Sequence, residues 1–381
     1  MISKIKPKIL FFAFHSIVTS KNYFRILESK ADCSWVTFHP QVYREISEAG
    51  YKNVFFRNML FCQLKLDLLD KIFRRVNVWH IRQTLEARIG QVIKRLKPDI
   101  IISDTTKVLP LYGARNDMIM KVQVFHSVPY KKYITIADTL AYDLILLPSE
   151  HHKHQLCQRF KVPDPDKLQV VGWPRVDNFL NGTFTQKDKD AFTKRFNLKP
   201  RQKTVLYAPS WDAFHDKGLF PRSFGAREKA FEIFCRRIKE EGVNLIVKFH
   251  PASHKLICDT RIHRIAEKYN VRLAYKSSTE CLDSLVEQFL WSADVLISDV
   301  SGVISDFMVL NRPIVYIEPD ANDFKWHESD LSEEFRAGVV VSTLEELIGA
   351  VKRSLRDPQE YALERKKIVN RIFYKLDGLS A

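Results

Sequence analysis

Short apolar runs alternate with stretches of helical periodicity along this chain. The runs are rich in Val, Ile and Leu and lack a polar face, which is typical of strands buried on both sides of a parallel sheet. They fall into two groups, which predicts two such sheets. The predicted strands are Ile9–Phe14, Ser34–Phe38, Ile100–Ser103, Val122–Phe125, Leu144–Leu147 and Leu168–Val171, then Val205–Ala208, Leu245–Lys248, Arg272–Ala274, Val295–Ser298, Ile314–Ile317 and Val339–Ser342.

The same alternation predicts the domain organisation. Strands that alternate with helices form α/β domains, in which helices cover both faces of a doubly wound parallel sheet. A chain of 381 residues is also too long for one ordinary core. Two such domains facing a central cleft would bind a ligand at the carboxyl ends of their strands. We expect an N-terminal domain over residues 1–182, a polar linker over 183–203, a second domain over 204–356 and a C-terminal helical segment over 357–381 that packs back on the first domain.

One helix start is predicted in the C-terminal segment. Asp357, Pro358 and Glu360 have the spacing of an N-cap, a first helical residue and a capping-box acid. This pattern predicts a helix that runs from Asp357 towards Phe373.

The positive charge of the chain is partly concentrated. Lys and Arg number 60 against 45 Asp and Glu, which gives a net charge of +15. Residues 71–97 are rich in Lys and Arg, and Leu85, Ile89, Val92 and Leu96 recur there at helical spacing. This basic helix either faces the core with a solvated cationic side or docks on an anionic membrane surface. We expect no nucleic-acid partner, because the chain has no nucleic-acid recognition motif.

Targeting and redox features favour a cytoplasmic location. No apolar run approaches the about 18 residues of a membrane span, and no secretory signal is evident. The six cysteines show no paired spacing, which is typical of reduced thiols. We therefore expect a cytoplasmic protein, peripheral on the inner face of the cell membrane.

Several predicted strands end in side chains suited to chemistry. "KVQVFHSVP" ends at His126, and "NLIVKFHP" carries Lys248 and His250, which lie two residues apart and therefore on one face. "VLYAPSWD" ends with Ser210 and Trp211. A single strand-end histidine is more often structural, but histidine is also the side chain best matched to proton transfer near neutral pH. Two of them in separate domains could converge on one ligand.

The stretch "ISDVSGVISDF" predicts a strand end, a tight turn and a short helix. A helix that starts near Ser301 would present free backbone N–H groups to a phosphate, and Gly302 would allow the phosphate to approach closely. Asp306 would lie on the same helical face and could accept hydrogen bonds from sugar hydroxyls. The alternative is an ordinary strand-to-helix turn in which Ser301 caps the helix.

Metal-like patterns are weaker. His151, His152 and His154 follow a helix start, where neighbouring side chains point in different directions. The acidic pairs Asp164–Asp166 and Asp188–Asp190 lie in polar turns away from strand ends. We therefore expect neither a metal site nor another cofactor.

Five ordered motifs carry a resemblance to a known family. "VFHSVPYKK", "GWPRVD", "YAPSWDAF", "VKFHP" and "SDVSGVISDFMVLNRPIVYI" have the order and spacing found in the CDP-glycerol glycerophosphotransferase family, from about residue 100 to the end of the chain. Members of that family build teichoic acids and related polyol-phosphate polymers. The resemblance implies a GT-B fold with two Rossmann-like domains, and an inverting, metal-independent transferase that works at the membrane surface.

The resemblance also implies roles for residues of this chain. His126 resembles the general base for the acceptor hydroxyl, and Lys131 lies on the acceptor side. His250, assisted by Lys248, resembles the group that binds the donor pyrophosphate as CMP leaves. The remaining donor-binding residues that the resemblance implies are Arg175, Ser210, Trp211, Ser301, Gly302 and Asp306.

The function expected from this resemblance is transfer of glycerol phosphate, or a related polyol phosphate, from a CDP-activated donor to a lipid-linked or polymer acceptor. Two departures keep alternatives open. The family's Gly-Thr-Pro-Leu-Lys after the first histidine is Ser127-Val128-Pro129-Tyr130-Lys131 here, and the Ser-Gly turn is similar to that of UDP-N-acetylglucosamine 2-epimerases. The alternatives are a nucleotide-sugar glycosyltransferase or epimerase, and a non-catalytic protein that binds anionic membranes or nucleic acid.

Overall fold

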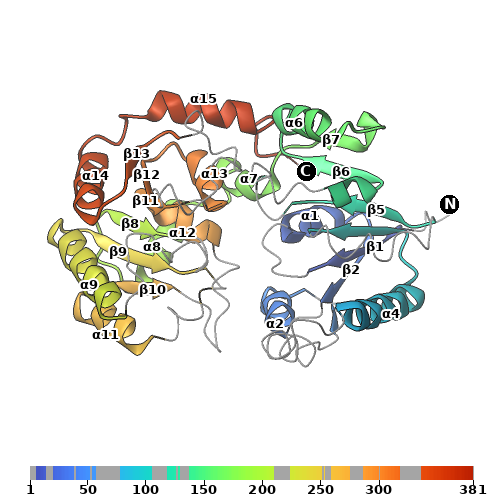
Figure 1. The fold of residues 1–381 in the computed structure, drawn as a ribbon, viewed down its shortest axis with the longest axis horizontal. Coiled ribbons are helices and arrows are strands. Elements are labelled where there is room, and N and C mark those ends of the chain that lie inside the picture. The colour runs from blue at the N-terminus through green and yellow to red at the C-terminus, as the bar shows by residue number, and fades with distance from the viewer. Residues whose placement is uncertain are drawn as a thin grey trace. The chain divides into compact units, whose positions relative to one another are not determined.

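The chain divides into two compact units. The computed structural model describes residues 6–13, 20–37, 40–51, 54–56, 78–104, 118–125, 128, 137–209, 224–250, 253, 259–274, 286–299, 301–317 and 336–380. Described residues up to Pro174 form the first unit and those from Arg175 to Ser380 form the second (Figure 1). The change of unit comes earlier in the chain than the domain boundary expected at residue 182.

The first unit is built on a seven-stranded parallel sheet with the order β3-β2-β1-β4-β5-β6-β7. Phe11, Phe24 and Trp35 form its aromatic core, with ring centroids 5.0–5.2 Å apart. Its elements are β1 (Lys8–Phe12), α1 (Ser20–Leu27), β2 (Asp32–Thr37), α2 (Pro40–Glu48), β3 (Val54–Phe56), α4 (Val78–Leu96), β4 (Ile100–Ser103), β5 (Met120–Gln123), a 3₁₀ turn (Ala137–Ala141), β6 (Leu144–Leu147), α6 (Glu150–Phe160), a second 3₁₀ turn (Pro165–Lys167) and β7 (Leu168–Val170).

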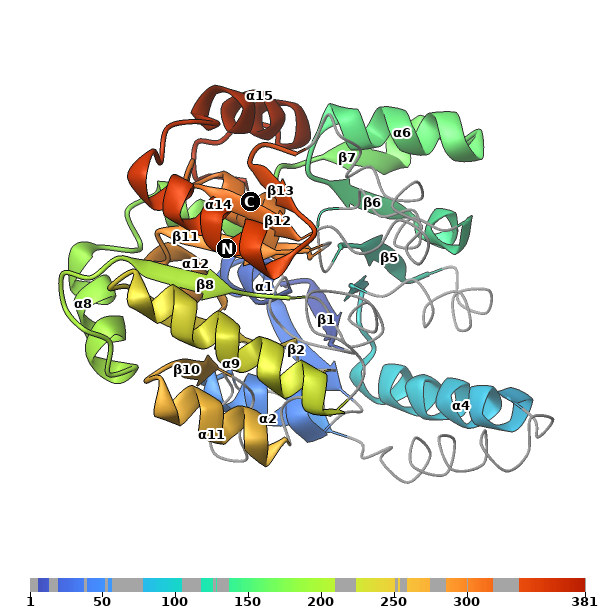
Figure 2. The same ribbon diagram turned by 60° about the vertical axis from the view of Figure 1, so that its left-hand side comes forward.

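The second unit is built on a six-stranded parallel sheet with the order β10-β9-β8-β11-β12-β13. Figure 2 shows α9 and α11 lying along the strands. Its elements are α7 (Pro174–Leu180), α8 (Gln186–Arg195), β8 (Thr204–Tyr207), α9 (Phe224–Glu240), β9 (Asn244–Lys248), α11 (Thr260–Lys268), β10 (Arg272–Ala274), α12 (Val286–Ser292), β11 (Val295–Ser298), α13 (Val303–Met308), β12 (Ile314–Ile317), β13 (Val339–Val341), α14 (Leu344–Arg356) and α15 (Ala362–Ile372).

Strand residues of the second sheet alternate between two helical layers. Val205, Val247 and Phe249 share a hydrophobic cluster with residues of α9, α11 and α14. Lys248 points the other way, where its Nζ lies 6.0 Å from the centre of the Phe289 ring on α12. Helices therefore cover both faces of this sheet, as the continuous apolar strands predict.

The predicted strands are confirmed, some with bounds that shift by one or two residues, and one strand among the described residues was missed. Val54–Phe56 forms β3 at the edge of the first sheet, paired in parallel with β2. This strand has three residues, which is too short to show a period of its own.

The predicted helix start at Asp357 is wrong. Asp357 instead terminates α14, and its N–H donates to the Arg353 carbonyl at 2.8 Å. The residue before a proline avoids the helical conformation, so Pro358 ends α14 rather than beginning the next helix. Glu360 pairs with Arg353, and α15 begins one turn later at Ala362.

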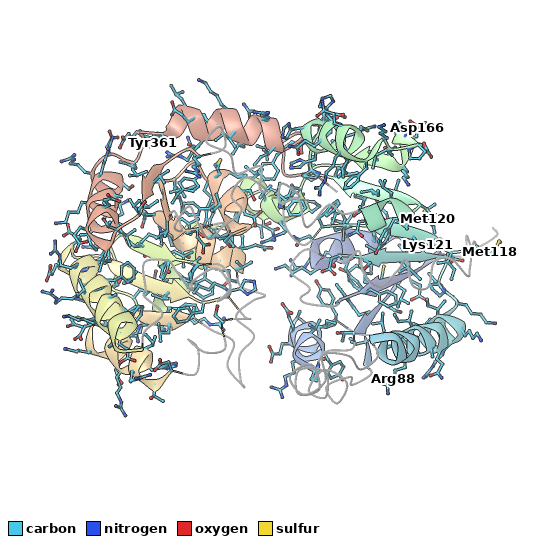
Figure 3. The ribbon with its side chains drawn as sticks, in the orientation of Figure 1. Arg88, Met118, Met120, Lys121, Asp166 and Tyr361 are labelled. Atoms are coloured by element: carbon cyan, nitrogen blue, oxygen red, sulfur yellow. The ribbon has the colours of Figure 1, made fainter. Side chains whose placement is uncertain are left out.

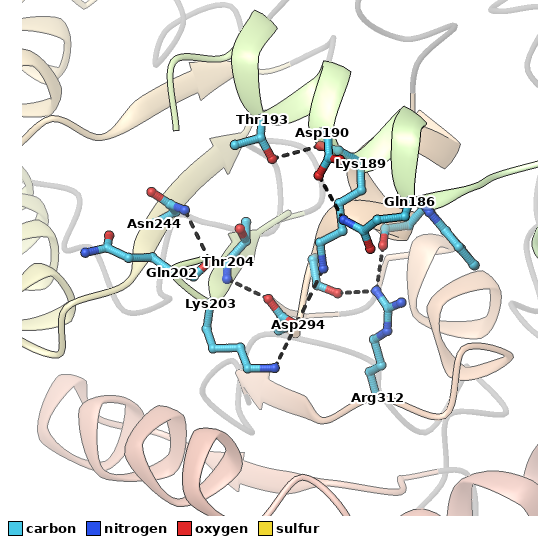
Figure 4. A network of polar contacts seen from close by, with 12 residues as sticks. Gln186, Lys189, Asp190, Thr193, Gln202, Lys203, Thr204, Asn244, Asp294 and Arg312 are labelled. Atoms are coloured by element: carbon cyan, nitrogen blue, oxygen red, sulfur yellow. Dashed lines mark hydrogen bonds and ion pairs between the residues drawn. The ribbon is translucent and has the colours of Figure 1, made fainter. Parts of the chain in front are cut away.

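The polar stretch expected as a linker contains α8, which is fixed to the second sheet. Asp294, just before β11, accepts the Thr204 N–H at 2.8 Å and lies 3.3 Å from Lys203 Nζ and 3.7 Å from Lys189 Nζ (Figure 4). The Asn244 side chain closes the loop after α8 through hydrogen bonds with the N–H and carbonyl of Lys199, both at 2.9 Å. These contacts hold α8 at the amino ends of the strands.

The basic helix expected over residues 71–97 is described from Val78 as α4. Its Ile89, Val92 and Ile93 are buried, so one side of the helix faces the core. Arg88 on the same helix is half-buried (Figure 3). Lys71, Arg74 and Arg75 lie outside the described residues, and membrane docking by this segment stays a prediction.

Candidate active site

The strand order of the second sheet reverses between β8 and β11, and polar groups gather where these strands end. The Ala208 N–H donates to the Ile297 carbonyl at 2.9 Å, and Ser298 Oγ donates to the Ala208 carbonyl at 2.6 Å. Ser298 and Asp299 are buried. Ligands of open α/β sheets bind at such a reversal, so this edge of the second unit is a candidate donor site.

Lys248 and His250 end β9, the strand beside β8. Lys248 is buried on the α12 side of the sheet, whereas the neighbouring Phe249 is buried in the opposite layer. His250 is exposed, and its carbonyl accepts the Ser253 N–H at 2.8 Å. The alternation predicted from "VKFH" is confirmed, and the imidazole is accessible to a ligand.

The Ser-Gly turn after β11 opens a short helix. Gly302, rather than Ser301, is the N-cap of α13, which has only six residues. Ser301 is buried, its carbonyl accepts the Ile304 N–H at 3.2 Å, and Ser305 Oγ donates to the Gly302 carbonyl at 2.9 Å. The strand, turn and helix are confirmed, while phosphate binding at the turn remains a prediction.

Arg175 and Asp306 form a buried ion pair within the second unit. Arg175 Nη2 lies 2.6 Å from Asp306 Oδ2, and the two side chains are 6% and 3% exposed. The pair joins α7 to α13. Two residues that the resemblance places at the donor site are thus brought together, and the Asp306 carboxylate is paired with a guanidinium of this chain.

Helix α7 is held by further polar contacts. Asp177 accepts hydrogen bonds from the N–H and the Oγ of Ser380, at 3.0 and 2.7 Å, and burial raises its pKa. Asn178 Nδ2 donates to Glu287 of α12 at 3.0 Å. Helix α15 packs against α13. The contacts described for the C-terminal segment within the second unit include those with α13 and α7, and its packing on the first domain stays a prediction.

Four predicted site residues, His126, Lys131, Ser210 and Trp211, lie outside the described residues. His126 follows Val124, whose N–H donates to the Ser103 carbonyl at 2.9 Å. The role of His126 as a base and the role of Lys131 on the acceptor side stay predictions. Donor contacts by Ser210 and Trp211 also stay predictions.

Sequence reasoning missed a buried acid in the first unit. Asp104 directly follows β4 and is 5% exposed. Burial, and after it the charge of Glu45, raise the pKa of Asp104 to about 7. The sequence did contain a signal for this acid, because "IIISD" at the end of β4 has the same Ser-Asp pair as "LISD" at the end of β11.

Some residues of the metal-like patterns have structural roles. His152 is buried, its Nδ1 lies 2.8 Å from Ser149 Oγ, and burial lowers its pKa to about 3. Asp164 accepts the Asp166 N–H, and Asp188 forms a capping box with Thr185. Across the described part of the chain, no three His, Cys, Asp or Glu side chains gather as metal ligands would. Nor is any described helix long and apolar enough to cross a membrane.

The sequence model of the family described as CDP-Glycerol:Poly(glycerophosphate) glycerophosphotransferase matches residues 79–381. The chain belongs to this family. The match includes every site residue that the motifs pointed to, and it extends the resemblance upstream of residue 100 to include α4 from its second residue.

A curated relative of this glycerophosphotransferase-family chain is consistent with the family assignment. It is 27% identical over 275 residues to the teichoic acid poly(glycerol phosphate) polymerase of Bacillus subtilis (strain 168), a match that covers 64% of this chain and 34% of that protein. It thus spans about a third of the length of that curated relative.

Two solved structures show the fold. A variant of the wall teichoic acid polymerase TagF soaked with CDPG has a TM-score of 0.65 at 16% identity, covering 98% of this chain and 86% of that one. The UDP-GlcNAc 2-epimerase from Neisseria meningitidis bound to UDP-GlcNAc has a TM-score of 0.62 at 14% identity, covering 98% and 97%. The predicted α/β fold of GT-B type, with two Rossmann-like parallel sheets, is confirmed.

Proposed function

We propose that this chain transfers glycerol phosphate, or a related polyol phosphate, from a CDP-activated donor to a lipid-linked or polymer acceptor and releases CMP. The observation that carries the proposal is the family match over residues 79–381. It is supported by an exposed histidine and a buried lysine at the end of β9, beside the reversal of strand order in the second sheet.

The proposed chemistry is a phosphoryl transfer. The acceptor hydroxyl oxygen attacks the phosphorus that carries the polyol, the bond from that phosphorus to the bridging oxygen breaks, and CMP leaves. His126 takes the hydroxyl proton, and His250 with Lys248 offsets the charge that develops on CMP. Such a reaction needs mainly positioning and electrostatic stabilisation, which cationic side chains supply.

A donor panel tests the proposal. CDP-glycerol, CDP-ribitol and several UDP-sugars are incubated side by side with the protein and a polyol-phosphate oligomer, and released CMP or UDP is measured. We expect CMP release from one CDP-polyol and none of the UDP-sugars to be consumed. Turnover of a UDP-sugar alone would contradict the proposal.

The nucleotide-sugar alternative has one specific observation in its favour, the fold shared with an epimerase bound to UDP-GlcNAc. It would require the turn of Ser301 and Gly302 to accept a UDP donor. The same panel separates the two functions when the remaining UDP-sugars are also analysed by chromatography. A glycosyltransferase would release UDP, whereas an epimerase would change the sugar of the UDP-sugar without transferring it to an acceptor.

We also propose that transfer is independent of a divalent metal ion. Lys248 and His250 could supply the positive charge that a metal supplies in other phosphotransferases. Transfer from the CDP-polyol is therefore expected to keep its rate, within about twofold, after dialysis against EDTA. Activity that is lost and then restored by Mg²⁺ or Mn²⁺ would show that the proposed mechanism is wrong.

We place the reaction at the inner face of the cell membrane, where a lipid-linked acceptor would be met. One side of α4 faces the core, whereas Lys94 and Arg95 of the same helix are exposed. Cationic side chains on a helix surface favour binding to anionic lipids. If the protein instead binds anionic vesicles and turns over no donor in the panel, the non-catalytic alternative is favoured.

A further inference from the structure

Asp104 occupies a position in the first sheet where ligands commonly bind. It directly follows β4, which lies beside β1, and the strand order reverses there because β2 and β3 lie on the other side of β1. In doubly wound sheets, the carboxyl ends of the two strands at such a reversal bind ligands. The proposed donor site lies at the corresponding reversal of the second sheet, so the first sheet has a second position of the same kind.

One oxygen of the Asp104 carboxyl group is buried without a hydrogen-bond partner. The residue is 5% exposed, and its Oδ1 has no hydrogen-bond partner among the residues that the structure describes. Leaving a buried polar atom unpaired is energetically costly, so such an atom in a native protein needs an explanation. A substrate group that pairs with it is one explanation.

The surroundings of Asp104 suit a neutral polar group. Glu45 of α2 is 1% exposed and lies near enough for its charge to raise the pKa of Asp104. The Tyr142 hydroxyl hydrogen-bonds Ser103, and burial raises the pKa of Tyr142 far above its usual value. Both carboxyl groups are buried, and the charge of Glu45 disfavours the ionised form of Asp104.

We propose that Asp104 binds a terminal hydroxyl of the polyol-phosphate acceptor, a role that rests on the proposed function. A hydroxyl group can donate a hydrogen bond to the buried Oδ1 of Asp104. A phosphate group would be repelled by the ionised form of the same carboxyl group. The hydroxyl end of the acceptor, rather than its phosphates, therefore meets the carboxyl end of β4.

The test compares Asp104→Asn with the wild-type protein on two acceptors. One is a soluble oligo(glycerol phosphate); the other is the same oligomer with its terminal secondary hydroxyl removed. Acceptor binding is measured by calorimetry without donor, and acceptor KM and kcat are measured with the CDP-polyol. The matched control is Asp99→Asn, an exposed aspartate just before β4 that accepts the Lys8 N–H at 2.8 Å.

We expect Asp104→Asn to weaken binding of the complete acceptor about tenfold, as loss of a buried hydrogen bond predicts, and to leave the donor KM unchanged. The deoxy acceptor should bind the variant and the wild type equally, because the contact is already lost. Asp99→Asn should match the wild type on both acceptors. Melting temperatures verify that each variant is folded.

Two results would overturn the inference. Asp104→Asn could weaken both acceptors equally or neither, which would make Asp104 a structural acid, or the wild type could fail to distinguish the two acceptors. Calorimetry needs no donor, so these results are independent of the donor panel. A chain that binds the acceptor but uses no CDP-polyol would reject the proposed function alone.

Discussion

Replacing His250 by alanine is expected to lower kcat for polyol-phosphate transfer by about 10²–10⁴-fold, the range typical of a lost proton-transfer or charge-stabilising group. The side chain is exposed at the end of β9 and contributes nothing to the buried core, so the variant should fold normally. Quench-flow or steady-state measurement of CMP release from the CDP-polyol gives the rate. His263→Ala, on α11 of the same unit, is the control and should retain the wild-type kcat.

The same rate measurement, applied to His126→Ala, His250→Ala and the double variant, tests whether His126 and His250 act in one step. If both act on one transferring phosphoryl group, the double variant should lose little more activity than the worse single variant, because residues that act as a unit are strongly non-additive. Losses that multiply would place the two histidines in separate steps. Wild-type kcat in both single variants would contradict the transferase mechanism.

Much of the fold is predictable because parallel strands leave a strong local signal. Strands such as Ile100–Ser103, Val295–Ser298 and Ile314–Ile317 are buried on both faces, so their apolar runs end where the strands end. Edge strands and strand-free turns carry less information. Val54–Phe56 is too short to show a period, and the Asp-Pro at 357–358 fits a helix start and a helix end equally well until the preceding helix is known.

The sequence predicted the candidate site only at the strand ends that were inspected for polar side chains. Strand-end reasoning identified Lys248, His250 and the turn after β11, yet it was not applied to β4, where Ser103 and Asp104 repeat the Ser-Asp ending of β11. Burial was the missing information, because a strand-end aspartate in a sequence looks like an ordinary loop acid. Only the fold shows that Asp104 is buried beside Glu45.

The partner of Asp306 could not be read from the sequence either. Arg175 and Asp306 are distant along the chain, and each was interpreted as a donor contact. The structure brings them together at 2.6 Å because α7 packs near α13 in the second unit. A pair of this kind can serve the site and the fold at once, and its energetic role can be measured separately from catalysis.

Breaking this pair from one side is expected to be strongly destabilising. Asp306→Ala would leave the buried Arg175 guanidinium without its carboxylate, and loss of one partner from a buried ion pair costs about 3–5 kcal/mol of unfolding free energy. Urea denaturation of the full chain, followed by tryptophan fluorescence and circular dichroism, measures this loss. The control is Lys352→Ala, which breaks a half-exposed pair with Glu241 at 2.9 Å and should cost no more than about 1 kcal/mol.

Removing both charges separates ion pairing from packing. The double variant Arg175→Met with Asp306→Ala buries no unpaired charge, so it should recover most of the stability that Asp306→Ala loses. Equal costs for the single and double variants would mean that Arg175 is not stranded when Asp306 is absent and finds another partner or water. In that case the ion pair would not be what holds α7 to α13, and the contacts of Asp177 with Ser380 and of Asn178 with Glu287 would have to hold the helix.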